Sequence, residues 1–227
     1  MRSVRIWFNK KDTAKYISHL DMTRCMTRAF RRTDIPLWYT EGFNPHPYLV
    51  FGLPLPLGAE GLREVLDIRL TDDSYTNERV LSELNRVSVP GIEFLEVAEP
   101  VEKNLAINKG YYTVTIPSVT DAKKLYNNIK EEIAKGDITI EKKTKKGGMK
   151  EINVSEHLMD FNCSFDNDTV TLSFILPAGI GLYWIISGIV QIIQQLALNY
   201  YFDKKGEDFV VKVPESKHQH GKKSKKR

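Results

Sequence analysis

The sequence holds only two cysteines, Cys25 and Cys163, and neither lies in a C-x-x-C pair. A structural zinc site takes about four Cys or His ligands, and a [4Fe–4S] cluster is held by closely spaced cysteines, so neither centre is predicted. A P-loop is also missing, because Gly52–Gly58 lacks the Lys and the Ser or Thr that would follow. We therefore expect no bound metal and no cofactor.

A long uninterrupted apolar run is missing too. The most apolar stretch, residues 175–198, is broken by Pro177 and three glycines, and its helical part carries one stripe of polar residues, Ser187, Gln191, Gln194 and Gln195. That stripe predicts an amphipathic helix at 182–198, whereas a membrane span takes about 20 apolar residues. Residues 1–8 are typical of a strand and not of a secretory signal. With two thiols, this favours a reducing compartment, so we expect a cytoplasmic protein without a membrane segment.

Charge is distributed unevenly along the chain. The net charge is +4, but residues 217–227 alone contribute +6, which leaves −2 for the rest. Residues 1–50 carry nine Lys and Arg against four Asp and Glu. A basic N-terminal element and a basic tail are compatible with contact to nucleic acid. Ordinary solvated charge with a solubilising tail is the alternative interpretation.

Hydrophobic periodicity divides residues 1–100 into strands and helices. Period-two patterns predict strands at 4–8, 37–40, 65–70 and 92–97. One helix is expected from Ser18, which forms a capping box with Asp21, to about Thr33, and another at 74–86. The order β-α-β-β-α-β is that of the ferredoxin-like split βαβ pattern.

The second half repeats this order with an insertion. Strands are predicted at 111–116, 138–140, 161–165, 170–176 and 209–213, helices at 121–134 and 182–198, and a turn or loop around Gly147-Gly148. We therefore predict an α+β protein of two tandem ferredoxin-like lobes, residues 1–100 and 111–214, with a linker at 101–110. The basic residues 215–227 are expected to form a disordered tail.

The segment Gly42–Pro47, Gly-Phe-Asn-Pro-His-Pro, is the most unusual local feature. Each of its two prolines fixes φ at about −65°, removes a backbone donor and favours an extended conformation in the residue before it. The loop is therefore expected to hold Phe43, Asn44 and His46 in fixed directions, as ligand-binding loops do. A purely structural connection between two strands is the alternative.

Four arginines lie off the predicted buried face of the first helix: Arg24, Arg28, Arg31 and Arg32. They are expected to form an exposed ridge that contacts phosphates. Aromatic residues close by in the sequence are suited to stacking on the bases of single-stranded RNA. The sequence thus predicts an RNA-binding surface made of this ridge and of Gly42, Phe43, Asn44 and His46. A solvated helix face beside ordinary core aromatics is the alternative.

His19 and His46 are the candidate catalytic residues. Either imidazole with a nearby tyrosine hydroxyl would suit general acid–base cleavage of RNA without a metal. The spacing matches no recognised motif, and Asp21, which would complete a His/His/carboxylate metal site, is already needed as a helix cap. No complete catalytic constellation is present, so we expect the chain not to be an enzyme on its own.

Three segments closely resemble the radical-SAM-linked protein family, a bacterial domain of unknown function. They are Tyr16–Asp21 (Tyr-Ile-Ser-His-Leu-Asp) with Arg31-Arg32, then Gly42–Pro47, then Gly52–Gly58 (Gly-Leu-Pro-Leu-Pro-Leu-Gly). The resemblance is strongest over residues 1–70. Members of that family occur alone or fused to the C-terminus of a radical SAM protein. The resemblance implies association with a radical SAM enzyme that acts on RNA or a translation component.

These observations lead to one main hypothesis and two alternatives. The main hypothesis is an accessory or substrate-binding module that is directed to RNA and works with a radical SAM protein. A metal-free RNA-processing enzyme that uses His46 or His19 is the first alternative. A pure protein-interaction module, in which Phe43 grips a partner, is the second.

Overall fold

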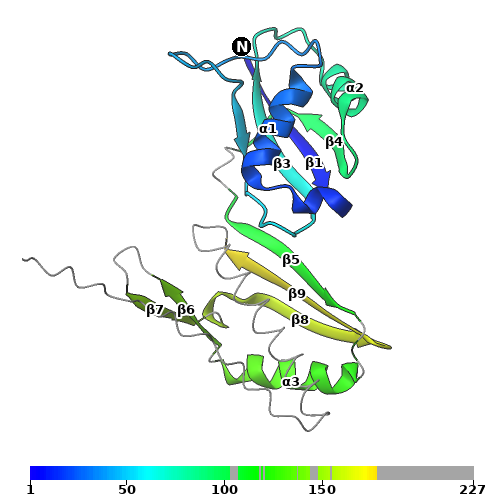
Figure 1. The fold of residues 1–227 in the computed structure, drawn as a ribbon, viewed down its shortest axis with the longest axis vertical. Helices are drawn as coiled ribbons and strands as arrows, with labels where there is room; N and C mark the ends of the chain where they lie inside the picture. The colour runs from blue at the N-terminus through cyan, green and yellow to red at the C-terminus, as the bar shows by residue number, and fades with distance from the viewer. Residues whose placement is uncertain are drawn as a thin grey trace, which may run out of the picture.

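The computed structural model describes residues 1–102, 107–117, 119, 121–136, 138–143, 148–153 and 155–177. The expected helix at 182–198, strand at 209–213 and tail at 215–227 lie outside these residues, as does part of the expected linker. The described chain is an α+β protein with a four-stranded antiparallel sheet, a three-stranded antiparallel sheet, a two-stranded hairpin and three α-helices. It forms two lobes, one above the other in Figure 1.

The first lobe is built in the order β1 (Arg2–Lys10), α1 (His19–Phe30), β2 (Leu49–Phe51), β3 (Gly61–Leu70), α2 (Asn77–Val87) and β4 (Ile92–Ala98). A short 3-10 helix (Asp12–Tyr16) joins β1 to α1. The sheet order is β2-β3-β1-β4, and every neighbouring pair is antiparallel. The element order of this lobe is therefore the one that periodicity predicts.

The core of the first lobe lies between β1 and the two helices. Val4, Ile6 and Phe8 alternate along β1 and are buried in one cluster with residues of both helices, among them Met26 of α1 and Leu84 of α2. Ser18 is confirmed as the N-cap of α1, because its side chain accepts the Asp21 N–H at 3.1 Å. In place of the second bond of a capping box, the Ser18 hydroxyl donates to Asp21 Oδ2 at 2.7 Å. α1 ends at Phe30, three residues before the predicted end.

The predicted strand at 37–40 is wrong in its position. Residues 37–48 form a hairpin that makes only isolated bridges, Leu37 to Leu70 and Tyr39 to Pro47, and the regular edge strand is β2. The prolines at 45 and 47 have no N–H to donate, so a continuous ladder cannot form there. The edge strand therefore begins only after this hairpin.

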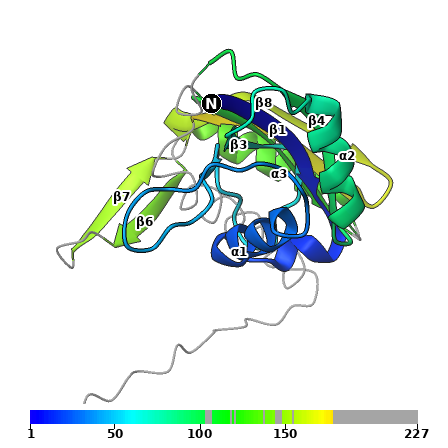
Figure 2. The same cartoon turned by 90° about the horizontal axis from the view of Figure 1, so that it is seen from above.

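The second lobe comprises β5 (Lys109–Ile116), α3 (Ala122–Lys135), β8 (Met159–Asp166) and β9 (Thr169–Pro177), with sheet order β5-β9-β8. The predicted hairpin at 161–176 is confirmed as β8–β9, with Asn167 at positive φ in its turn. β6 (Thr139–Lys143) and β7 (Met149–Asn153) pair only with each other and extend away from the lobe (Figure 2). A short 3-10 helix (Ser155–His157) precedes β8.

Each lobe has a core of its own. The second core holds Leu125 and Ile129 of α3 with Leu172 and Phe174 of β9. Leu53, from the segment between β2 and β3, is the first-lobe residue that packs against it. No helix within the described residues is long and apolar enough to cross a membrane.

Because the cores are separate, a cavity in one should leave the other intact. We expect Leu84→Ala to destabilise the first lobe by about 2–5 kcal/mol, since Leu84 is fully buried. Hydrogen exchange should accelerate at β1 and β3 amides and stay unchanged at β9. Leu125→Ala is the matched control and should give the reverse pattern. Equal loss of protection in both lobes by either variant would show one cooperative unit instead.

Candidate functional site

The four predicted arginines lie together on a groove along the outer side of α1. The groove has a volume of about 680 Å³. It is lined by α1, the turn after it and Val89, which precedes β4; its residues are Asp21, Arg24, Cys25, Arg28, Ala29, Arg31, Arg32 and Val89. We call it the arginine groove. All four arginine side chains are exposed, as the helical periodicity predicts.

The four arginines differ in how they are held. Arg24 forms an ion pair with Asp21 at 2.9 Å, and Arg32 donates to the carbonyl oxygen of Val87. Within the described residues, Arg28 and Arg31 form no hydrogen bond through their side chains and no ion pair. These two guanidinium groups are therefore available to an anionic ligand. Their position at the end of α1 also complements the helix dipole, which is a sufficient structural reason for a positive charge there.

The Gly42–Pro47 segment, which we call the tip loop, closes the hairpin of residues 37–48. The hairpin is held by backbone bonds from Thr40 N–H to the His46 carbonyl oxygen (2.9 Å) and from Tyr48 N–H to the Trp38 carbonyl oxygen (3.1 Å). The His46 N–H also donates to Thr40 Oγ1 at 3.2 Å. Gly42 adopts a φ of 125°, a value that L side chains rarely adopt. The loop is thus ordered by its own bonds, and Phe43 at its tip is fully exposed.

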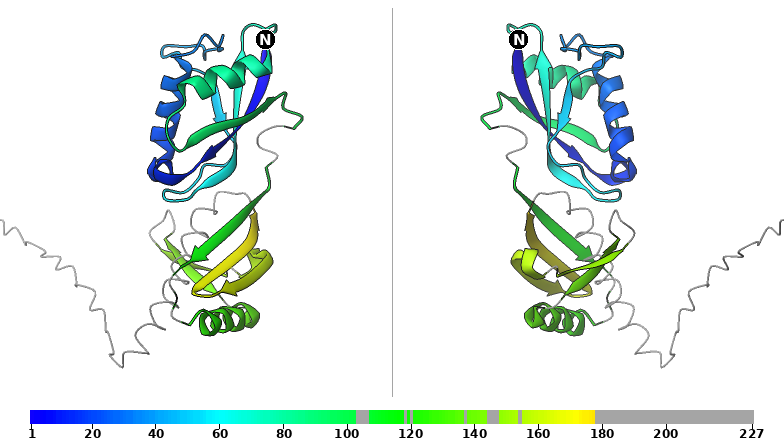
Figure 3. Two further views of the ribbon diagram at one scale, coloured as in Figure 1. Left: turned by 90° about the vertical axis from the view of Figure 1, so that its right-hand side faces the viewer. Right: turned by 90° about the vertical axis from the view of Figure 1, so that its left-hand side faces the viewer.

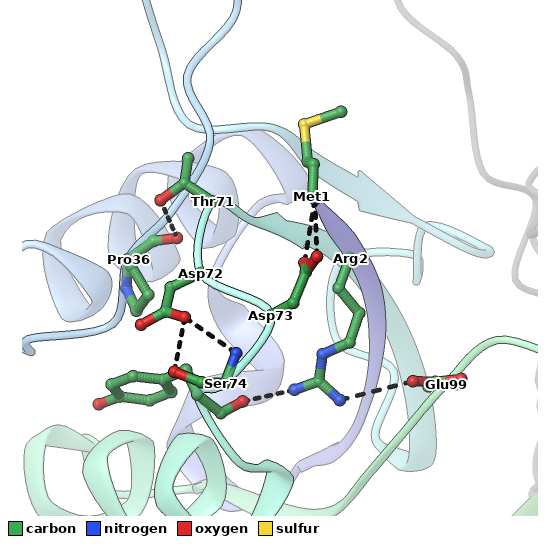
Figure 4. A network of polar contacts seen from close by, with 9 residues as sticks. Met1, Arg2, Pro36, Thr71, Asp72, Asp73, Ser74 and Glu99 are labelled. Carbon is green, nitrogen blue, oxygen red and sulfur yellow. Dashed lines mark hydrogen bonds and ion pairs between the residues drawn. The ribbon is translucent and has the colours of Figure 1, made fainter.

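Contacts to β3 fix the base of this hairpin. Trp38 N–H donates to the Arg69 carbonyl oxygen at 2.9 Å, and the Arg69 guanidinium lies over the rings of Trp38 and Tyr48, 5.3 and 4.2 Å from their centroids. Thr71 donates its N–H (2.8 Å) and its hydroxyl (3.2 Å) to the carbonyl oxygen of Pro36 (Figure 4). The tip loop therefore projects from a rigid base.

The tip loop lies at the end of the first lobe where α1, and with it the arginine groove, finishes. Figures 1 and 3 show the hairpin projecting from the end at which α1 finishes. No hydrogen bond or ion pair among the described residues joins the loop to the four arginines. That the two form one binding surface stays a prediction.

His19 and His46 are not brought together. His19 begins α1 and packs edge-on against Phe51, with 5.1 Å between ring centroids. His46 lies in the tip loop, beyond the other end of this helix of 12 residues, which is about 18 Å long. Its Nδ1 lies 3.0 Å from Thr40 Oγ1 and 3.1 Å from the Asn44 carbonyl oxygen. Within the described residues, no group of three or more His, Cys, Asp or Glu is placed to hold a metal ion.

His19 instead borders a small cavity whose lining shares no residue with the arginine groove. Its volume is about 20 Å³, enough for one water molecule. Its walls combine three ionisable side chains, Lys10, His19 and Glu64, with apolar residues: Phe8, Met22, Phe51, Leu53, Pro54 and Leu55. Because Leu53 also packs on the second core, the cavity lies at the junction of the lobes. We call it the junction cavity.

Burial dominates the electrostatics of the junction cavity. It raises the pKa of Glu64 to about 7, although the charge on Lys10 opposes the shift. Burial also lowers the pKa of Lys10, whose Nζ donates to the Ile17 carbonyl oxygen at 2.8 Å. The pKa of His19 is lowered by burial and by the Lys10 charge. Burial, with a smaller effect of Glu64, raises the pKa of Tyr112 in β5 to about 12.

The Glu64 carboxyl is held without a partner. No hydrogen bond or ion pair to it forms within the described part of the chain. Its side chain folds over Gly61, where an added Cβ would meet Glu64 Oε1 at 2.6 Å. A buried carboxyl, an amine and an imidazole with shifted pKa values are the groups that exchange protons in active sites, and structural clusters can have the same shifts.

Residues 3–181 match the model of a bacterial family described as "Uncharacterized protein conserved in bacteria (DUF2344)". The chain belongs to this family. The matched range contains the arginine groove, the tip loop and the junction cavity. A search of curated proteins finds none that matches. The match confirms the bacterial domain of unknown function that the motifs indicate.

Sequence reasoning missed Lys10 and Glu64. Both lie just outside the predicted strands at 4–8 and 65–70, whereas in the structure β1 continues to Lys10 and β3 begins at Gly61. The signal that was available is Gly61, a small residue that opens β3 and faces Lys10 in the register of β1 and β3. It leaves space for the Glu64 side chain, but only the paired strands show this.

The raised pKa of Glu64 makes stability depend on pH. Below the unfolded pKa of about 4.3 the carboxyl is protonated in both states and does not change the free energy of unfolding. As the pH rises from there to the folded pKa of about 7, the carboxyl ionises in the unfolded state first, so the fold is progressively destabilised. We expect Glu64→Gln to be more stable than the wild type by about 2 kcal/mol at pH 8, after allowing for solvent screening of a half-buried group. The difference should vanish near pH 4.

Thermal unfolding of both proteins from pH 4 to pH 8 measures this effect. Glu131→Gln removes the same charge at an exposed position of α3 and serves as the matched control. A constant difference between wild type and Glu64→Gln across the pH range would contradict the burial of an ionisable carboxyl at this site.

Proposed function

We propose that this protein is an RNA-binding accessory module that works with a radical SAM enzyme. The observation that carries the RNA part is the arginine groove, in which two of the four guanidinium groups, those of Arg28 and Arg31, form neither a hydrogen bond nor an ion pair within the described residues. Guanidinium groups bind phosphate oxygens in a bidentate manner and remain charged at any physiological pH. A concave surface with four of them is a suitable receptor for a phosphate backbone.

The radical SAM part of the proposal comes from the resemblance of the three sequence segments. Two cysteines cannot ligate a [4Fe–4S] cluster, so the chain would supply substrate binding and its partner the radical chemistry. We also propose the tandem ferredoxin-like arrangement as the scaffold. The first sheet has the order β2-β3-β1-β4. In the second sheet, β5-β9-β8, the strand predicted at 209–213 would pair with the edge strand β5 to give the same order.

Charge reversal in the groove tests the RNA part. We expect Arg28→Glu with Arg31→Glu to abolish the binding of RNA, because a phosphate contact becomes a repulsion at two positions. The control is Lys123→Glu with Lys124→Glu, the same change in charge at the exposed first turn of α3. Fluorescence anisotropy at low and high salt measures both, since phosphate contacts weaken steeply with salt. Unchanged binding by the groove variant would refute the proposal.

Co-purification from native cells at low salt tests the partnership. The proposal expects a radical SAM protein and RNA to accompany the wild-type chain, and ribonuclease to remove the RNA. Recovery of RNA without any iron–sulfur protein would support the RNA-binding function and refute the partnership with a radical SAM enzyme.

A second candidate function, a protein-interaction module, is favoured by the tip loop. Phe43 is fully exposed on an ordered loop, and no Lys or Arg occurs between residues 33 and 62. An uncharged aromatic tip is suited to an apolar pocket, where single aromatic side chains contribute much of the binding energy.

If Phe43 anchors a protein partner, Phe43→Ala should weaken its association by about 2 kcal/mol or more, roughly 30-fold, with little dependence on salt. The measurement is the dissociation constant of the co-purified complex. Phe43→Tyr keeps the ring and serves as the control. Loss of RNA affinity with unchanged protein association would instead place Phe43 on the RNA surface.

A further inference from the structure

The floor of the arginine groove is apolar, while its rim is charged. Ala29 and Cys25 of α1 line it together with Val89 from the segment before β4, and none of the three carries a formal charge. Charged phosphate groups gain nothing from contact with an apolar surface. The flat face of a nucleobase is stabilised there, because it packs against apolar atoms and stacks on guanidinium planes.

The size of the groove limits its occupant. A volume of about 680 Å³ is that of a site for a small molecule or for a short stretch of a flexible strand. The rim arginines Arg24, Arg28 and Arg31 lie within seven helical steps, about 10 Å along the axis, which is the length of only a few nucleotides. A duplex keeps its bases stacked inside, so it can offer only phosphates to the rim and leaves the floor unfilled.

Resting on the RNA-binding function proposed above, we propose that the arginine groove binds one unpaired RNA strand, with a base on the floor of Cys25, Ala29 and Val89 and the neighbouring phosphates on Arg28 and Arg31. Arg24 contributes less, because Asp21 already neutralises it at 2.9 Å. The groove thereby selects single-stranded over double-stranded RNA.

Cys25 provides a reporter inside the site. It is half-buried in the groove floor, and burial raises the pKa of its thiol, so it alkylates slowly but measurably at alkaline pH. The other thiol, Cys163, is buried in the second core, and Cys163→Ser removes it from the assay. A strand that covers the floor should therefore protect Cys25 from iodoacetamide.

The experiment compares an unstructured RNA 10-mer with the same sequence annealed to its complement. We expect the single strand to bind more tightly, and, at about ten times its Kd, to slow alkylation of Cys25 about ten-fold, because only the free protein reacts. Replacing Arg28 and Arg31 by Gln removes two phosphate contacts. The slope of log K against log salt concentration should then decrease in magnitude by about 1.4 if the bound RNA is single-stranded, and by about 1.8 if it is a duplex. Lys123→Gln with Lys124→Gln is the matched control.

The outcomes separate this inference from the function on which it rests. Equal or tighter duplex binding, or an unprotected Cys25 under saturating single strand, overturns the inference. If charge reversal at Arg28 and Arg31 still abolishes binding in that case, the RNA-binding function stands. Failure of both RNA forms to bind overturns the RNA-binding function itself.

Discussion

The rest of the first lobe depends on the burial of β1 at the centre of its sheet. Val4, Ile6 and Phe8 lie beneath α1 and α2, and hydrogen bonds to β3 and β4 satisfy the backbone on both sides. On the opposite face of the strand, Arg5 binds Asp67 through two bonds of 2.7 and 2.9 Å. β1 is thus packed on both faces and hydrogen-bonded along both edges. Its position therefore determines where α1, α2, β3 and β4 lie.

Two features with different chemistry follow from this position. Because the apolar face of α1 must meet β1, the four arginines are turned outward and line the groove with Val89. Because β1 ends at Lys10 opposite Gly61, an amine and the Glu64 carboxyl meet at the edge of the core, next to the second lobe. The helix separates them, so one side offers cations to solvent and the other holds ionisable groups away from it.

The Glu64 carboxyl in the junction cavity lowers the stability of the fold at neutral pH. A half-buried carboxyl without a hydrogen-bond partner loses part of its hydration when it is ionised, which destabilises the fold, and an apolar residue of similar size would avoid this penalty. The charge on the same carboxyl contributes to the raised pKa of Tyr112, so the two lobes affect one another electrostatically here. Each lobe otherwise keeps its own core, with Leu53 as the apolar contact across the junction.

Local patterns were sufficient for the three α-helices that the structure describes and for most of the described strands. Ser18 and Asp21 predicted the start of α1, and the helical period of 3.6 residues predicted that the four arginines are exposed. Both predictions succeed because these properties depend only on neighbours in the sequence. The strand predicted at 37–40 failed because strand pairing is non-local: the prolines of the tip loop interrupt the ladder, and β3 finds its partner in residues 49–51 instead.

By itself, the sequence determined the α+β class, the basic ridge and the stiffness of the tip loop. Only the tertiary structure decided that Val89 turns the ridge into a groove, that His19 and His46 lie at opposite ends of α1, and that Lys10, His19 and Glu64 converge. These three outcomes concern residues from different segments of the chain. Whether such residues meet is set by the register of paired strands and by the packing of α1 on β1, which no local pattern contains.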